Sequence, residues 1–373
     1  MTLVAVTSQV RFAGEAIYSG FFRVLDLDTG QTITTEPVPE SPWRSVDPNP
    51  RGGLRGAKGI SVCGERMIVG NSDTIFVLDP RWRISSSFTH PFAGSLHDVL
   101  AEDDAIWITC TNADLLLKVD WEGNELARWS WRTDGGLRRA FGFGSLPAFD
   151  PRIDYRDPKD LQGGVHNIVH LNGIARSEEG LLLSFGRVLS PAEVRRRRLR
   201  AVAGRLAGRF GVTRPFPTKP VPVPTTFLPG SSSAVVLLRE LGAPAEVLLH
   251  VKDVVVPNHN VLAVDDRIVY ADSNGSCVVA VDRATGAERA AVTVPGEPAF
   301  VRGLARLEGD TYLVGSQRPL AVHAVDLSRG NVVASYPLKG GETETVYAVA
   351  PVPPGFARPA GEIFRAQREG VAA

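Results

Sequence analysis

A three-residue pattern that recurs along the chain constrains the fold more than any other feature of the sequence. Each copy has a polar residue, a small or short polar residue and an aliphatic residue, and the copies begin at Lys58, His97, Asn172, His259, Arg302 and Tyr347. A turn and a β-rich run follow each of the first five copies, and a third run often ends in Val-Asp or Leu-Asp. Four short strands in about 40 residues are typical of one β-propeller blade.

The two ends of the chain complete the last blade of this predicted ring. The copy that begins at Tyr347 has its first strand and then loses the pattern, whereas three β-rich runs lie within residues 2–37. In these runs Asp26 occupies the place that Asp282 occupies in another blade. Joining strands from both ends covers edges that would otherwise invite aggregation. The sequence therefore predicts an all-β chain in which residues 1–373 form one six-bladed β-propeller.

Composition excludes several classes of protein. The 373 residues include 41 Lys and Arg and 41 Asp and Glu, so the formal net charge is zero and no nucleic-acid partner is expected. The three cysteines are too few for a disulfide framework and lack the spacing of a metal site. No apolar run approaches the roughly 20 residues that a membrane helix needs. The N-terminus lacks the features of a secretory signal, so we expect a cytoplasmic protein.

Polar side chains gather on one face of the predicted ring. The first strand of each blade lines the central channel of a propeller, and the turns between second and third strands lie on the same face. Polar groups that converge on one concavity are the usual mark of a ligand site, although a wet channel alone also accommodates them. The residues that we expect to bind a substrate are Asn172, Asn112, Asp272, Asn274 and Arg187.

Four of the seven histidines belong to this face. His97 and His259 each begin a blade, and either His170 or His166 would supply a third imidazole from just before Asn172. Three protein ligands with an open position are the pattern of a catalytic transition-metal site. Imidazole suits zinc, iron, copper or nickel better than magnesium or calcium, and zinc is the metal that we expect. The other interpretation is that these histidines bind an anionic substrate, or one another through water.

The remaining channel residues suggest catalytic roles. Arg302 and Lys58 are cations that would hold a carboxylate or phosphate of the substrate, or stabilise developing negative charge. Tyr347 would transfer a proton as a general acid or base.

Two insertions interrupt the regular blade spacing. The first, 132–165, is rich in Gly, Pro, Arg and aromatic residues, and we expect an ordered, lid-like loop on the functional face. The second, 188–232, begins with a predicted helix near 191–209 whose N-cap is Ser190 and continues into a Pro-rich extended segment. This basic helix would cap the channel, mediate self-association, bind weakly to an anionic membrane surface or simply pack on the propeller.

The blade pattern and the channel residues resemble the six-bladed propellers of the NHL-repeat and gluconolactonase (senescence-marker) type, and also bacterial propeller proteins without an assigned reaction. The resemblance covers nearly the whole chain apart from the two insertions. It implies a metal at the top of the channel, as in the lactonases, the phosphotriesterases and the peptidylglycine amidating lyase. In the amidating lyase histidines from different blades hold zinc, and His97, His259 and His170 match that arrangement. The gluconolactonase calcium site is matched only at Asn172, because Lys58 opens the first complete blade.

Two functions therefore compete on the sequence. The first is a metal-dependent lyase, hydrolase or isomerase that acts on a small polar or anionic substrate at the top of the channel. The second is a non-catalytic propeller that binds a protein or a glycan, because fold does not decide function. A weaker third possibility is a membrane-surface accessory protein recruited through the arginines of the predicted helix.

Overall fold

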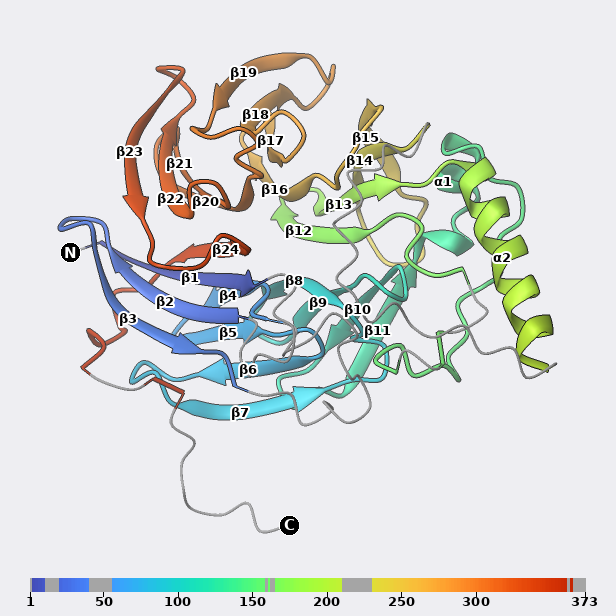
Figure 1. Cartoon of the computed structure of the whole chain (residues 1–373), viewed down its shortest axis with the longest axis horizontal. Coiled ribbons are helices and arrows are strands. Elements are labelled where there is room, and N and C mark those ends of the chain that lie inside the picture. The colour runs from blue at the N-terminus through green and yellow to red at the C-terminus, as the bar shows by residue number, and fades with distance from the viewer. Residues whose placement is uncertain are drawn as a thin grey trace, which may run out of the picture.

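The computed structural model of this chain describes residues 2–10, 20–39, 56–157, 160–161, 165–209, 230–360 and 363–364, with the side chains of the second helix up to residue 203. It contains six four-stranded antiparallel sheets arranged around a central axis, with the first strand of each sheet innermost (Figure 1). The predicted six-bladed propeller is confirmed.

The first three complete blades follow one another along the chain. Blade one consists of β4 (Ile60–Cys63), β5 (Arg66–Gly70), β6 (Thr74–Leu78) and β7 (Ile84–Thr89). Blade two consists of β8 (Leu96–Ala101), β9 (Ile106–Cys110), β10 (Leu115–Val119) and β11 (Glu125–Ser130). Blade three consists of β12 (Leu171–Ser177), β13 (Gly180–Val188), β14 (Ser232–Leu238) and β15 (Glu246–Lys252).

The remaining blades close the ring. Blade four consists of β16 (His259–Val264), β17 (Arg267–Asp272), β18 (Cys277–Asp282) and β19 (Glu288–Thr293). Blade five consists of β20 (Arg302–Glu308), β21 (Thr311–Ser316), β22 (Ala321–Asp326) and β23 (Asn331–Pro337). Blade six takes its inner strand from the C-terminal part of the chain and its other strands from the N-terminal part, in the order β24 (Glu344–Pro351), β1 (Leu3–Val10), β2 (Gly20–Asp26) and β3 (Gln31–Pro37).

A buried polar cluster fastens the two ends of the chain inside blade six. Strand β1 pairs with β24 on one side and with β2 on the other. The Ser8 hydroxyl of β1 donates to the carboxylate of Glu344 on β24. Arg23 Nη1 on β2 lies 2.7 Å from Glu344 Oε1 and donates to Ser8 Oγ at 2.8 Å. All three side chains are almost wholly buried, so the pairing is held by charge as well as by the β-ladder.

The hydrophobic core is divided among the six interfaces between neighbouring blades. Each of the six clusters of buried side chains combines residues from two adjacent blades. Because side chains alternate along a strand, successive residues of one strand serve different clusters. Met67 and Val69 pack against blade six, whereas Ile68 packs against blade two. Each sheet is thus covered on both faces, and its middle strands are mostly apolar.

In three of the blades, close packing explains why the second residue of the recurring pattern is glycine. A Cβ atom at Gly59 would lie 2.9 Å from the Cα of Asp98 in the next blade, and one at Gly303 would lie 2.9 Å from the Cα of Ala348. A Cβ atom at Gly173 would likewise lie 3.1 Å from the Cα of an asparagine in blade four. Blades one, three and five therefore carry glycine, because the backbones of adjacent inner strands meet there.

The first insertion packs as an ordered segment with η1 (Trp131–Thr133) and α1 (Gly135–Ala140). Its aromatic residues Phe141 and Phe143 are buried between blades two and three, and Tyr155 is buried between blades one and two. The predicted order is confirmed for the described part. These aromatic rings pack in the clusters between blades. A role of the insertion as a lid therefore stays a prediction.

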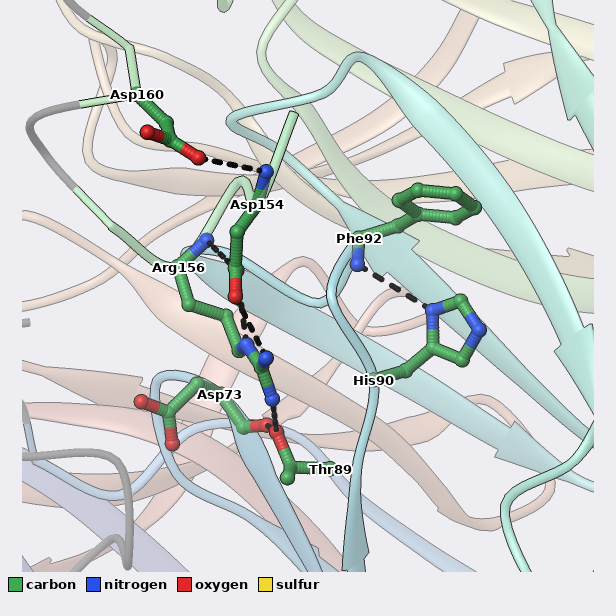
Figure 2. A network of polar contacts seen from close by, with 7 residues as sticks. All are labelled: Asp73, Thr89, His90, Phe92, Asp154, Arg156 and Asp160. Carbon is green, nitrogen blue, oxygen red and sulfur yellow. Dashed lines mark hydrogen bonds and ion pairs between the residues drawn. The ribbon is translucent and has the colours of Figure 1, made fainter. Parts of the chain in front are cut away.

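A polar network ties the same insertion to blade one (Figure 2). Arg156 forms a two-point ion pair with Asp154 at 2.6 and 2.9 Å and donates from Nη1 to Thr89 Oγ1 at 3.1 Å. The Thr89 hydroxyl donates in turn to the Asp73 carbonyl oxygen at 2.7 Å. Arg156 is buried, so this network holds the insertion beside the second-to-third-strand turn of blade one.

The second insertion lies between β13 and β14, and its helix α2 (Pro191–Arg209) is at the outer edge of blade three (Figure 1). Ser190 Oγ accepts from the Glu193 amide at 3.3 Å, which confirms the predicted N-cap. Val194 is buried in the cluster between blades two and three, whereas Leu199 and Val202 are exposed. The predicted Pro-rich segment lies largely outside the described residues.

No helix in the described part of the chain is long and apolar enough to span a membrane. Binding of α2 to an anionic membrane surface, or to a second copy, stays a prediction.

Replacing Arg23 by Met tests the cluster that closes blade six. Removing one member of a buried ion pair leaves the other charge uncompensated and costs about 3–5 kcal/mol. We expect the free energy of unfolding, measured by chemical denaturation, to fall by about that amount. Arg329→Ala is the matched control, because Arg329 pairs with Asp326 on the surface and should have no measurable effect. Equal stability of the two variants would contradict the proposed role of the cluster.

Candidate functional site

The structure brings six of the predicted site residues into one closed ring around the channel. Lys58 Nζ lies 4.4 Å from the centre of the Tyr347 ring, and the Arg302 guanidinium carbon lies 5.2 Å from the same ring on blade six. The His97 ring centre lies 5.7 Å from that of Tyr347 and 4.8 Å from that of His170.

Phe300 completes this channel ring on its other side. The His170 and His259 ring centres are 6.4 Å apart, and His259 lies 6.2 Å from Phe300. Phe300 in turn lies 4.5 Å from the Arg302 guanidinium carbon. Phe300 was not predicted from the sequence. We call this set the channel ring, and its members are Lys58, His97, His170, His259, Phe300, Arg302 and Tyr347.

Register shifts at the blade openings aim several of these side chains. In blade two the ladder passes from Leu96 to Val99, so His97 and Asp98 have no paired residue opposite them. Equivalent shifts occur at the openings of blades three to six, including the one that leaves Tyr347 unmatched on β24. A β-bulge bends a strand and re-aims a side chain. The bulges therefore contribute to the convergence of residues from separate blades.

The His97 imidazole is fixed through one of its two nitrogens. Nδ1 lies 2.7 Å from the Ser95 carbonyl oxygen and 2.8 Å from Thr111 Oγ1. The Thr111 hydroxyl already donates to the Leu171 carbonyl oxygen of blade three at 2.5 Å. Both neighbours of Nδ1 are therefore acceptors, which places a proton on Nδ1. In the neutral imidazole, Nε2 then carries the lone pair.

The same arrangement recurs in blade four. His259 Nδ1 lies 2.9 Å from Ser273 Oγ, and the Ser273 hydroxyl donates to the Val301 carbonyl oxygen beside blade five at 2.8 Å. The histidine and the hydroxyl residue are fourteen positions apart in both blades. These hydroxyl residues orient the imidazole and also join blade two to blade three and blade four to blade five.

His170 reaches the ring from a segment that a buried ion pair holds in place. Asp114 Oδ2 accepts from the Ile168 amide at 2.5 Å, and Oδ1 accepts from the Val169 amide at 3.2 Å. Arg132 Nη2 lies 3.2 Å from the same carboxylate, and both charged side chains are buried. His170 has a left-handed backbone with φ of 50°, which such external anchoring helps to maintain. Neither charged residue was predicted from the sequence to belong to the site.

Electrostatics in the ring keep one imidazole neutral. Burial first, and then the nearby charge of Lys58, His170 and Arg302, hold the pKa of His97 well below its usual range. The Ser95 carbonyl opposes this shift only in part. A neutral imidazole with its lone pair on Nε2 can accept a proton or a hydrogen bond near pH 7.

Several of the residues predicted to bind a substrate hold loops together in the structure, and a binding role for them stays a prediction. Asn274 accepts from the amides of Val255 and Val256 at 2.8 and 2.9 Å and thereby fastens the segment before blade four. Asp272 accepts from the Asn274 amide at 2.9 Å. Asn112 donates to the Tyr155 carbonyl oxygen at 3.3 Å and anchors the first insertion.

Three other predicted residues have different surroundings. Asn172 is buried and donates to the Asn258 carbonyl oxygen at 2.6 Å, while its side-chain oxygen has no hydrogen-bond partner among the described residues. Arg187 lies near Arg197 and Glu193 at the base of α2, and burial lowers its pKa. His166 packs against Tyr155 with ring centres 5.5 Å apart, and burial followed by the charge of Arg132 lowers its pKa to about 4.

The structure does not contain a preassembled metal site in its described part. No three side chains of His, Cys, Asp or Glu there are placed to hold one metal ion. Although His97, His170 and His259 are neighbours, they contact one another edge to face. The donor types suit a transition metal, but their arrangement does not fit one, and the predicted metal stays a prediction.

Comparison with known proteins supports the fold and no particular family. No family model and no curated protein matches the sequence. The chain is similar to a propeller in the crystal structure of a nidogen/laminin complex, with 8% identity, a TM-score of 0.53 and coverage of 93% of this chain and 97% of that one. It is equally similar to a protein of unknown function from Bacteroides caccae, with 12% identity, a TM-score of 0.53 and coverage of 94% and 98%.

A third structure of this kind is virginiamycin B lyase from Staphylococcus aureus, with 11% identity and a TM-score of 0.44 over 77% of this chain and 86% of that one. At such identities the similarity to the first two structures, with TM-scores of 0.53, shows the fold alone. The resemblance predicted from the blade pattern is therefore supported at the level of the propeller.

Lys58→Met tests the electrostatics of the ring. Because the Lys58 charge lowers the pKa of His97, its removal should raise that pKa. Ring ¹⁵N and ¹³C chemical shifts followed through a pH titration measure the change. Lys118→Met, which alters a lysine packed on Trp107 in blade two, is the control and should leave the pKa of His97 where it is. An unchanged His97 titration in the Lys58 variant would contradict this account.

Proposed function

We propose that this protein is an enzyme that acts on a small polar or anionic substrate at the channel ring. The observation that carries the proposal is the convergence of two cations, a tyrosine and three imidazoles from all six blades. Polar groups of several chemical types gathered in this way are the usual composition of a ligand site.

The burial of the ring favours a small ligand. Lys58, His97, His259, Arg302 and Tyr347 are each less than 10% exposed. A folded protein or a branched glycan touches surfaces that are accessible before binding, whereas a small molecule can enter a narrow channel. We therefore place the non-catalytic binding module second.

The residues of the ring have complementary roles in this proposal. Lys58 and Arg302 attract and orient an anionic group of the substrate. His97 accepts a proton through Nε2, because its other nitrogen donates to the wall of the channel. The proton-transfer role of Tyr347 stays a prediction from the sequence. Lyase, hydrolase and isomerase reactions are all compatible with one base beside two cations.

Ligand-observed NMR with a panel of small carboxylates and phosphates tests the proposal. Loss of one charge-assisted hydrogen bond costs about 1.5–3 kcal/mol, which corresponds to roughly 10–100-fold in the dissociation constant. We expect Lys58→Met and Arg302→Met each to weaken binding to that extent. A time-dependent change in the spectrum of a bound compound should be lost in His97→Gln.

The matched control is Arg283→Met, because Arg283 pairs with Glu179 on the outside of the ring. Unchanged binding in both ring variants would contradict the proposal. Elemental analysis of the wild type beside His97→Ala tests the predicted metal in the same preparations, since a transition metal lost in the variant would show that the histidines assemble around it.

A further inference from the structure

The channel ring is divided into two chemically different halves. Blades five, six and one supply Arg302, Tyr347 and Lys58, which contact one another through the tyrosine ring. Blades two, three and four supply His97, His170 and His259, which contact one another in that order. The cations and the imidazoles are therefore segregated around the axis.

We propose that the two halves recognise two groups on one small molecule, an oxyanion held by Lys58 and Arg302 and a hydroxyl or amine donor held by the histidines. This inference rests on the proposed function and narrows its substrate class to a small carboxylate or phosphate that also carries a hydrogen-bond donor. It concerns binding alone and requires no particular reaction.

The histidine half acts as an acceptor because of the hydrogen bonds at Nδ1. For His97 these go to the Ser95 carbonyl oxygen and to Thr111, whose hydroxyl proton is already used. His259 has the equivalent bond to Ser273, and the Ser273 hydroxyl donates onward at 2.8 Å.

The third imidazole has the same arrangement, with Nδ1 as the donor and Nε2 as the acceptor. His170 Nδ1 lies 3.0 Å from Asn167 Oδ1, an amide oxygen that can only accept. In all three rings the proton of the neutral imidazole therefore resides on Nδ1. In the neutral ring the remaining nitrogen, Nε2, is a hydrogen-bond acceptor and cannot donate to an oxyanion.

The cation half offers hydrogen-bond donors, whereas the histidine half offers acceptors. Lysine and arginine have only donors at their charged ends, and a guanidinium suits the two oxygens of a carboxylate or phosphate. Because the two cations share the Tyr347 ring, they act on one region of the channel. An oxyanion at that region would direct a neighbouring hydroxyl toward the imidazoles across the ring.

Matched pairs of ligands test this inference. Lactate is compared with propionate, and hydroxyethyl phosphate with ethyl phosphate, so that the hydroxyl group is the only difference and the two pairs distinguish the oxyanions. Lactamide keeps the hydroxyl without the charge. We expect the hydroxylated member of at least one pair to bind at least tenfold more tightly, and lactamide to bind weakly.

Two variants of one residue isolate the acceptor. In His97→Asn the side-chain amide can still bond at the place of Nδ1 but does not reach the place of Nε2. The ratio of the dissociation constants of the two members of a ligand pair should therefore fall toward one. In His97→Gln the amide reaches the place of Nε2 and offers an oxygen there, so part of the preference should remain. An equal preference in the two variants and the wild type would overturn the inference.

A measurement on the unmodified protein is independent of how the variants fold. Ring ¹⁵N chemical shifts should show Nδ1 protonated and Nε2 unprotonated in His97, and the opposite tautomer would overturn the inference.

The ligand measurements also separate this inference from the proposed function. If both members of every pair bind equally and binding depends on Lys58 and Arg302, the inference fails while the proposed function stands. If no member of either pair binds, or if the two cations have no influence, both fail.

Discussion

Every part of this structure depends on the burial of each sheet between two neighbours. The hydrophobic core consists of six clusters, one at each interface between blades. Both faces of every sheet are therefore packed against a neighbouring blade. The ring must close for the last cluster to form. Closure is achieved by pairing β1 with β24 and by burying Ser8, Arg23 and Glu344 together. The termini of a long chain thus become part of one cooperative core.

The same packing shapes the channel. Adjacent inner strands approach so closely at the openings of blades one, three and five that only glycine fits beside the next backbone. At the same position blades two and four carry a polar side chain that accepts a hydrogen bond from the next blade. Asp98 accepts from the Ile174 amide at 3.3 Å, and Asn260 accepts from the Gly303 amide at 2.8 Å. Blades therefore alternate around the axis, with Lys58, Asn172 and Arg302 on odd blades and His97, His259 and Tyr347 on even ones.

This alternation connects packing with chemistry. The residues on even blades all carry rings, and two of them are oriented by a hydroxyl that also bridges to the next blade, as Thr111 and Ser273 do. Structural contacts between blades therefore set the tautomers of His97 and His259. The sequence spacing of fourteen residues from His97 to Thr111 and from His259 to Ser273 is a signal that could have revealed both positions.

The sequence by itself determined the ring, the closure of blade six, the positions of both insertions and most members of the channel ring. It could do so because blade periodicity and the alternation along a strand are local properties of the chain. Only the tertiary structure decided which polar residues face one another. Asn112 and Asn274 have the composition of ligand-binding turns but bond to the backbone of other segments, while Asp114 and Arg132 position His170 from another blade. Such contacts join residues distant in sequence, and no local pattern encodes them.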